Sequence, residues 1–83
     1  MITIKYFAKI RETIQQDGQE IDYAPTMSSI QDVIDYLSTL SPAHDAALSD
    51  DNLMAALNED YVPLTAAISD GDEIAFFPPM TGG

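Results

Sequence analysis

The sequence predicts an α+β domain in which one main helix packs on a mixed sheet of four to five strands. Three observations lead to this prediction: alternating apolar residues over 2–8, an apolar stripe over 27–40, and a compact apolar segment over 74–77. A period of two is typical of a half-buried strand, and spacings of three and four are typical of an amphipathic helix. Because a chain of 83 residues offers no second long helix, the stripe must pack on a sheet.

The N-terminal part is expected to form a long-looped hairpin. Residues 2–8 are expected to form a strand whose successive side chains point to opposite faces of the sheet. Ile2, Ile4 and Tyr6 lie on one face, and Thr3, Lys5 and Phe7 lie on the other. Residues 10–16 are expected to form a short helical turn that ends at Asp17-Gly18. Residues 19–24 alternate again and supply the second strand.

The main helix is the clearest element of the sequence. Its apolar stripe consists of Met27, Ile30, Val33, Ile34, Leu37 and Leu40. Thr26, Ser28 or Ser29 is expected to cap its N-terminus, since a hydroxyl there accepts a free backbone N–H. Ser41-Pro42 is expected to end it.

The remaining segments are short. Residues 42–52 are expected to be irregular, with one possible helical turn over 43–48. A strand is expected over 53–57, followed by a turn at 58–60 and a second strand at 61–62. Residues 64–68 are expected to be a loop or an edge piece, and a turn at 69–72 leads into the last strand. This order favours the β-grasp (ubiquitin-like) arrangement, with the first and last strands parallel at the centre. A ferredoxin-like layout would need a second full helix, for which 43–48 is too short.

If the first and last strands are neighbours, their side chains divide between two faces. Ile4, Tyr6, Ile74 and Phe76 are expected to point at the helix, and Phe7, Ala75 and Phe77 at the uncovered face. Exposed aromatic residues on an open face are a candidate protein-binding patch. The alternative is a loop that folds over them.

Composition excludes several classes of function. The formal net charge is −11, and the three cations, Lys5, Lys9 and Arg11, lie near the N-terminus. Binding to nucleic acid or to an anionic membrane needs a basic surface, so neither is expected. The acidity is explained either by solubility or by attraction to a basic partner. The chain has no cysteine, which excludes disulfides and thiolate metal sites. No apolar run of signal or membrane length is seen, so a cytoplasmic location is expected.

No catalytic or metal-binding set is apparent. His44 stands alone in a polar segment and is expected to be solvated. Asp70, Asp72 and Glu73 resemble part of a calcium loop but lack the spacing of an EF-hand, so a turn is expected instead.

The C-terminus is the most informative segment. Pro78 and Pro79 stop the last strand, so residues 1–83 are expected to form one domain with 78–83 as a flexible arm. Gly82-Gly83 has no side-chain bulk and could thread a narrow channel. The reactive group of such an arm is the Gly83 carboxylate, which becomes an acyl donor only after attack on the α-phosphate of ATP. This pattern favours a carrier over an enzyme, although two terminal glycines also arise by chance.

Residues 69–83 closely resemble the C-terminus of the MoaD branch of the ThiS/MoaD family of ubiquitin-like sulfur carriers. Phe7-Ala8, Ile10-Arg11-Glu12 and Pro25-Thr26 also fit that family, and the resemblance spans the chain. Met80 stands where smaller apolar residues are more usual.

The resemblance implies a sulfur carrier subunit of molybdopterin synthase. An E1-like enzyme would adenylate Gly83 with ATP, and a persulfide sulfur donor would convert the adenylate to a thiocarboxylate. The tail would then enter the large synthase subunit, which carries the catalytic side chains, and pass sulfur to cyclic pyranopterin monophosphate in molybdenum cofactor biosynthesis. The resemblance further implies a heterotetramer of two small and two large subunits. No bound cofactor and no metal site are expected in the chain. The expected partner-binding residues are Phe7, Phe77, Pro78, Pro79, Met80, Thr81 and Gly82.

Several alternatives share parts of this pattern. Sister carriers for thiamine or tRNA thiolation and protein-conjugating modifiers use the same fold and activation. A passive ubiquitin-like binding module would not need Gly83. A plant-type ferredoxin is excluded because it needs four cysteines. An acyl carrier protein is excluded because no Asp-Ser step is present.

Overall fold

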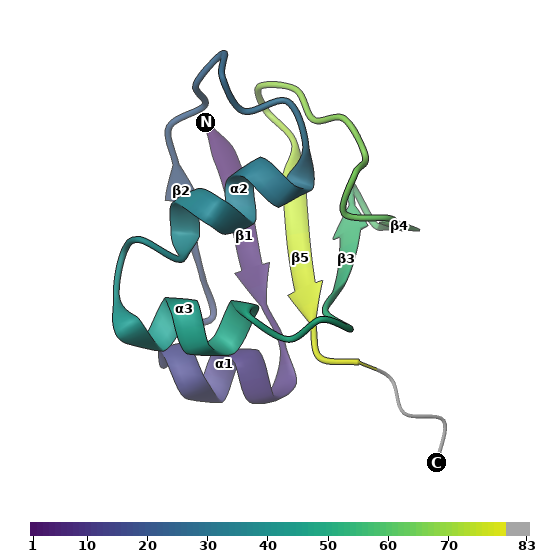
Figure 1. The fold of residues 1–83 in the computed structure, drawn as a ribbon. Helices are drawn as coiled ribbons and strands as arrows, with labels where there is room; N and C mark the ends of the chain where they lie inside the picture. The colour runs from purple at the N-terminus through teal and green to yellow at the C-terminus, as the bar shows by residue number, and fades with distance from the viewer. Residues whose placement is uncertain (80–83) are drawn as a thin grey trace.

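The computed structural model of the chain describes residues 1–79. Within that range it contains one five-stranded sheet and three helices, with α2 lying across one face of the sheet and α1 packed beside α3 at one end (Figure 1). The strands are β1 (Ile2–Tyr6), β2 (Gly18–Ile21), β3 (Met54–Leu57), β4 (Asp60–Val62) and β5 (Glu73–Phe77). The helices are α1 (Ala8–Ile14), α2 (Ile30–Leu37) and α3 (Pro42–Leu48).

The sheet has the order β2-β1-β5-β3-β4, so the last strand lies at its centre. β5 pairs in parallel with β1, where Ile4 lies opposite Ile74 and Tyr6 opposite Phe76. It pairs antiparallel with β3 on its other side. This mixed sheet with the first and last strands side by side confirms the predicted β-grasp fold. β5 is held by hydrogen bonds along both edges, which makes it a fixed base for the residues that follow.

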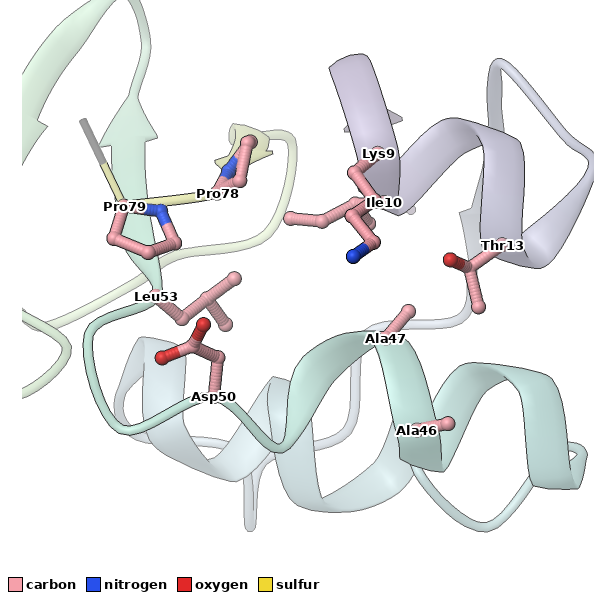
Figure 2. A pocket seen from close by; sticks show the side chains of 9 residues that line it. All are labelled: Lys9, Ile10, Thr13, Ala46, Ala47, Asp50, Leu53, Pro78 and Pro79. Atoms are coloured by element: carbon pink, nitrogen blue, oxygen red, sulfur yellow. The ribbon is translucent and has the colours of Figure 1, made fainter. Parts of the chain in front are cut away.

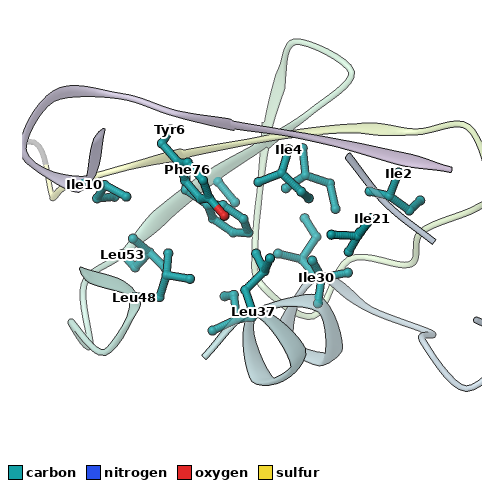
Figure 3. Close-up of a cluster of buried hydrophobic side chains, with 14 of the residues drawn as sticks. Ile2, Ile4, Tyr6, Ile10, Ile21, Ile30, Leu37, Leu48, Leu53 and Phe76 are labelled. Atoms are coloured by element: carbon teal, nitrogen blue, oxygen red, sulfur yellow. The ribbon is translucent and has the colours of Figure 1, made fainter. Parts of the chain in front are cut away.

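The core lies between the helices and one face of the sheet (Figure 3). Its largest fully buried side chains come from β1, α2 and β5. They are Tyr6, Phe76, Ile2, Ile4, Ile30, Leu37, Ile74 and Val33. The predicted division of faces is therefore confirmed for the residues expected to point at the helix.

Helix α2 is shorter than its apolar stripe. Ser29 is the N-cap and forms a capping box with Asp32, whose side chain accepts from the backbone N–H of Ser29 while the Ser29 hydroxyl accepts from that of Asp32. Met27 is buried but precedes the helix, and Leu40 is exposed beyond it. The stripe predicted the buried face correctly, and the cap decided where the helix begins.

The expectation for 42–52 was an irregular segment with one possible helical turn over 43–48, and the structure has a seven-residue helix there, α3 (Pro42–Leu48). Ser41 is its N-cap and accepts a hydrogen bond from the backbone N–H of His44 at 3.1 Å, and Pro42 occupies the first turn. Proline lacks a backbone N–H, which costs nothing at this position. Ser41-Pro42 is thus a helix start, and the described chain has three helices of similar length, with seven residues in α1, eight in α2 and seven in α3.

Other boundaries differ by a few residues. α1 begins at Ala8, so β1 ends at Tyr6, and β2 ends at Ile21, short of the expected 24. The antiparallel pairing of β1 with β2 confirms the hairpin, and the pairing of β3 with β4 confirms the expected contact between 53–57 and 61–62. Among residues 1–79, no helix has the length and apolar character needed to cross a bilayer.

Candidate functional site

The described chain ends two residues after β5, at Pro79. The last strand residue, Phe77, pairs with Met54 of β3, and the carbonyl oxygen of Phe76 accepts from the backbone N–H of Phe7 at 3.2 Å. Pro78 and Pro79 follow, and both are half-buried. Met80, Thr81, Gly82 and Gly83, which carry the predicted carrier chemistry, lie outside the described residues. The described site is therefore the root of the C-terminal arm.

Three aromatic side chains gather on the face of the sheet opposite α2, and we call them the aromatic patch: Phe7, Tyr61 and Phe77. The rings of Phe7 and Phe77 stack with centroids 4.8 Å apart and an interplanar angle of 6°. Tyr61 lies against Phe77 at 5.6 Å. Phe7 is 37% exposed and Tyr61 is 62% exposed, so no loop of the described chain buries the patch. The sequence analysis placed Phe7 and Phe77 on this face. It missed Tyr61, because a strand of three residues is too short for its partner strand and register to be assigned from sequence.

The backbone next to Phe7 is bent sharply. Phe7 is extended and serves as the N-cap residue of α1, with its carbonyl oxygen accepting from the N–H of Ile10 at 3.2 Å. Ala8 has a φ of 52°, in the left-handed region that residues with a Cβ seldom adopt. The chain thus passes from β1 into α1 without a loop, which fixes Phe7 on the open face.

On the other side of the β5 end lies a hollow that we call the arm-root hollow, with a volume of about 180 Å³ (Figure 2). Its lining comes from α1, α3, the chain leading into β3 and the two prolines. The lining residues are Lys9, Ile10, Thr13, Ala46, Ala47, Asp50, Leu53, Pro78 and Pro79. Ile10 and Leu53 are buried and make an apolar floor, while Lys9 and Asp50 are exposed at the rim. The sequence missed this hollow because it offered only a possible helical turn over 43–48 and gave no sign that this segment packs beside α1.

The three cations differ in their surroundings. Lys5 Nζ lies 3.3 Å from Glu73 Oε1, and Arg11 Nε lies 3.8 Å from Asp17 Oδ1. Among the described residues, Lys9 has no carboxylate within 4.0 Å. Lys9 is therefore a cation at the arm root that no described carboxylate neutralises.

The expectation that His44 is solvated is wrong, because its side chain is only 6% exposed. His44 Nε2 lies 2.9 Å from Gln19 Oε1, and Nδ1 lies 2.7 Å from Ser41 Oγ. A carbonyl oxygen only accepts, so Nε2 carries the proton and the Ser41 hydroxyl donates to Nδ1. The Tyr6 hydroxyl also donates to Gln19 Oε1, at 2.8 Å. These bonds tie α3 to β2 and β1 and so support the wall of the arm-root hollow.

Burial shapes the titration of this network. Desolvation raises the pKa of Tyr6 to about 12, so its hydroxyl stays protonated and can donate to Gln19 at neutral pH. Both ring nitrogens of His44 are hydrogen-bonded to side chains of the chain itself, Nδ1 to Ser41 and Nε2 to Gln19. His44 is thus a structural residue.

The acidic turn before β5 is also structural. Asp72 accepts from the backbone N–H of Ser69 at 2.7 Å and from the Asn58 side chain at 3.1 Å. Asp70 pairs with the N-terminal ammonium group. Among residues 1–79, no group of three or more side chains is arranged to hold a metal ion. The turn predicted over 69–72 is confirmed.

Comparison with protein families gives a match to the ThiS family over residues 4–83. The chain belongs to the ThiS family. This ThiS-family chain is 36% identical over 83 residues to the molybdopterin synthase sulfur carrier subunit of Escherichia coli, with all of both chains covered.

Solved structures show the same fold. The crystal structure of small archaeal modifier protein 1 from Haloferax volcanii matches with a TM-score of 0.73 and 26% identity, covering 95% of this chain and 97% of that one. One chain in a structure of the complex of subunits 1 and 2 of the molybdopterin-converting factor from Helicobacter pylori matches with a TM-score of 0.67 and 20% identity, covering 99% of this chain and 97% of that one. The ThiS-family chain thus matches a protein named as a sulfur carrier subunit over its full length, and one named as a modifier over 95% of its length.

Proposed function

We propose that this chain is the sulfur carrier subunit of a molybdopterin synthase and that Gly83 carries the sulfur. The observation that supports this most strongly is the full-length similarity to a sulfur carrier subunit, combined with a sequence that ends in Gly82-Gly83. The fold contributes a central strand, β5, which is followed directly by Pro78 and Pro79 and then by the C-terminal residues of the sequence. The carrier itself needs no catalytic side chain, because its chemistry is that of an activated carboxylate.

The proposed reaction begins at the Gly83 carboxylate. One carboxylate oxygen attacks the α-phosphate of ATP and pyrophosphate leaves, which gives an acyl-adenylate. The terminal sulfur of a donor's persulfide then attacks the acyl carbon and displaces AMP. Cleavage of the resulting acyl disulfide by a thiol leaves the thiocarboxylate on Gly83, and its sulfur is passed to cyclic pyranopterin monophosphate. An E1-like enzyme supplies the first step and the large synthase subunit the last.

The aromatic patch is the proposed contact for these partners. Phe7, Tyr61 and Phe77 surround the end of β5, so a partner that receives the arm meets the patch at the same time. Exposed aromatic side chains are the residues that most often dominate binding energies. The complex of two subunits named for the Helicobacter pylori structure supports a large-subunit partner for this chain as well. By analogy with the family, two small and two large subunits would form a heterotetramer.

Intact-mass spectrometry of the chain isolated from cells with their sulfur machinery tests the proposal. We expect a mass gain equal to the exchange of one oxygen for sulfur, located in the C-terminal peptide. Removal of Gly83 should abolish the gain and the synthase activity while leaving the thermal unfolding curve unchanged. Synthase activity that persists without Gly83 would refute the proposal.

A second candidate is a protein modifier, which is favoured by the 26% identity to small archaeal modifier protein 1. A modifier uses the same activated carboxylate, but a lysine amine of another protein takes the place of the sulfur nucleophile. Covalent adducts that contain the chain in cell extracts, together with an unmodified free chain, would favour this candidate. A carrier for thiamine or tRNA thiolation would give the same thiocarboxylate and is distinguished by which sulfur-containing product is lost in a deletion strain.

A further inference from the structure

We propose that the arm-root hollow is a second docking site for the large synthase subunit. In this proposal the large subunit inserts an apolar side chain between α1 and α3 and places a carboxylate opposite Lys9. The inference rests on the proposed function and specifies which part of the carrier, beyond the aromatic patch, its stable partner contacts.

The shape of the hollow suits a side chain of a partner. Its volume is about 180 Å³, and its floor consists of the buried side chains of Ile10 and Leu53. An apolar cavity of about 150 Å³ is large enough to hold benzene. Figure 2 shows Lys9 and Asp50 reaching toward the hollow from opposite sides, with Ala46 and Ala47 of α3 along its lower edge. The site therefore combines an apolar floor with a charged rim, which is the common anatomy of an interface pocket.

Charge points to an acidic group on the partner at this position. The chain has 14 acidic residues and three basic ones, and the other two basic side chains are paired with carboxylates. Lys9 has no described carboxylate within 4.0 Å, and Asp50 on the same rim is beyond that distance. An unneutralised cation on a strongly acidic protein is complementary to a carboxylate, and such pairs fix the register of a complex.

The position of the hollow connects it to the arm. Pro78 and Pro79, the first two residues after β5, form one of its walls. A partner channel that encloses the chain from Met80 onward must therefore begin beside the hollow. On the other side of β5, Phe7 of the aromatic patch is separated from Lys9 only by the bent residue Ala8. The patch and the hollow thus lie on two sides of the chain at the end of β5, where Pro78 and Pro79 follow Phe77.

The area needed for a stable assembly favours the large subunit over a transient enzyme. A specific stable interface buries about 800 Å² on each partner. A fully buried aromatic side chain contributes about 150–250 Å², and all three residues of the patch are already partly covered within the chain. The patch alone therefore falls short of a stable subunit interface, and the adjoining hollow is the surface that extends it around the arm.

Calorimetric titration of the purified chain with the large subunit encoded in the same genome tests this site. Thr13→Phe fills the hollow from an exposed position of α1, and we expect binding to weaken about tenfold or more. The matched control is Thr39→Phe, which adds the same ring at an exposed threonine after α2, outside the hollow, and should leave the affinity within about twofold.

Reversing the charge of Lys9 changes the affinity for the large subunit in opposite directions under long-range attraction alone and under our proposal. If only long-range attraction to a basic partner mattered, Lys9→Glu would tighten binding because it makes the net charge more negative than −11. Our proposal predicts the reverse, a loss of about tenfold or more, with affinity retained by Lys9→Arg. Circular dichroism and thermal unfolding of each variant verify that the fold is intact.

The outcomes separate this inference from the proposed function. A wild-type chain that neither binds the large subunit nor acquires sulfur would overturn the proposed function. A wild-type chain that does both, while Thr13→Phe and Lys9→Glu bind the large subunit as tightly as wild type, would overturn only the second docking site. Loss of binding confined to the activating enzyme would likewise refute the assignment to the large subunit.

Discussion

Replacement of Phe77 by aspartate is the most direct test of the aromatic patch, because it should weaken binding to the large subunit more than folding. In the folded chain the ring of Phe77 stacks on Phe7 at 4.8 Å and contacts Tyr61 at 5.6 Å. Each aromatic contact is worth about 0.5–1.5 kcal/mol beyond the area it buries. Because all three rings are partly open to water, we expect the free energy of unfolding to fall by about 1–2 kcal/mol.

The cost to binding is expected to be larger. In the complex, the aspartate would lie desolvated between two aromatic rings, and the contribution of the phenyl ring to the interface would be lost. Truncation of a central aromatic residue commonly costs 2 kcal/mol or more, and a buried unpaired charge adds to it. We expect a total loss of about 3 kcal/mol, which corresponds to an affinity about 100-fold weaker.

Calorimetric titration and urea-induced unfolding measure the two effects on the same preparation. Tyr36→Asp is the matched control, because it also replaces an exposed aromatic residue, 42% exposed on α2, with aspartate. It should leave the affinity within about threefold of wild type, since surface changes away from an interface have small effects. Equal losses of affinity in both variants, or none in Phe77→Asp, would refute the role of the patch.

Two further predictions concern the stability of the domain that presents the arm. Hydrogen bonds from the backbone N–H and the hydroxyl of Ser28 hold the pKa of Asp32 below its ordinary value of 3.8. The ionised carboxylate therefore stabilises the fold above pH 3.8, and this contribution is lost as the pH falls through the lowered pKa. Accordingly, urea unfolding should show Asp32→Asn less stable than wild type at neutral pH, with the difference shrinking as the pH is lowered below 3.8; a constant difference would contradict the cap. His44→Ala leaves a cavity and removes the hydrogen bond to Gln19, which also accepts from Tyr6, so we expect unfolding by urea to become easier by about 2–4 kcal/mol. A loss below about 0.5 kcal/mol, the range of an ordinary surface change, would mean that the histidine is solvated after all.

The sequence was sufficient where a local pattern carried the physical signal. The alternation over 2–8 predicted which side chains of β1 are buried, because a strand repeats every two residues whatever it pairs with. The stripe from Ile30 to Leu37 predicted the buried face of α2 in the same way. The paired prolines marked the end of β5, since neither can donate to a ladder. The terminal Gly82-Gly83 suggested a carrier because its chemistry needs only a carboxylate and no neighbouring side chains.

Tertiary structure decided the features whose partners are far apart in the chain. Helix α3 has seven residues, too few to be stable alone, and it exists because it packs on α1 and α2. His44 is buried, and its Nε2–H donates a hydrogen bond to Gln19, 25 residues away, a partner that no local pattern around a lone histidine reveals. Tyr61 belongs to the aromatic patch because the folded sheet places β4 near Phe77 of β5. The arm-root hollow exists because α1 and α3 lie beside the end of β5. Spacing along the chain encodes which face of an element is buried, whereas cavities and buried polar networks arise only from segments that meet in the folded chain.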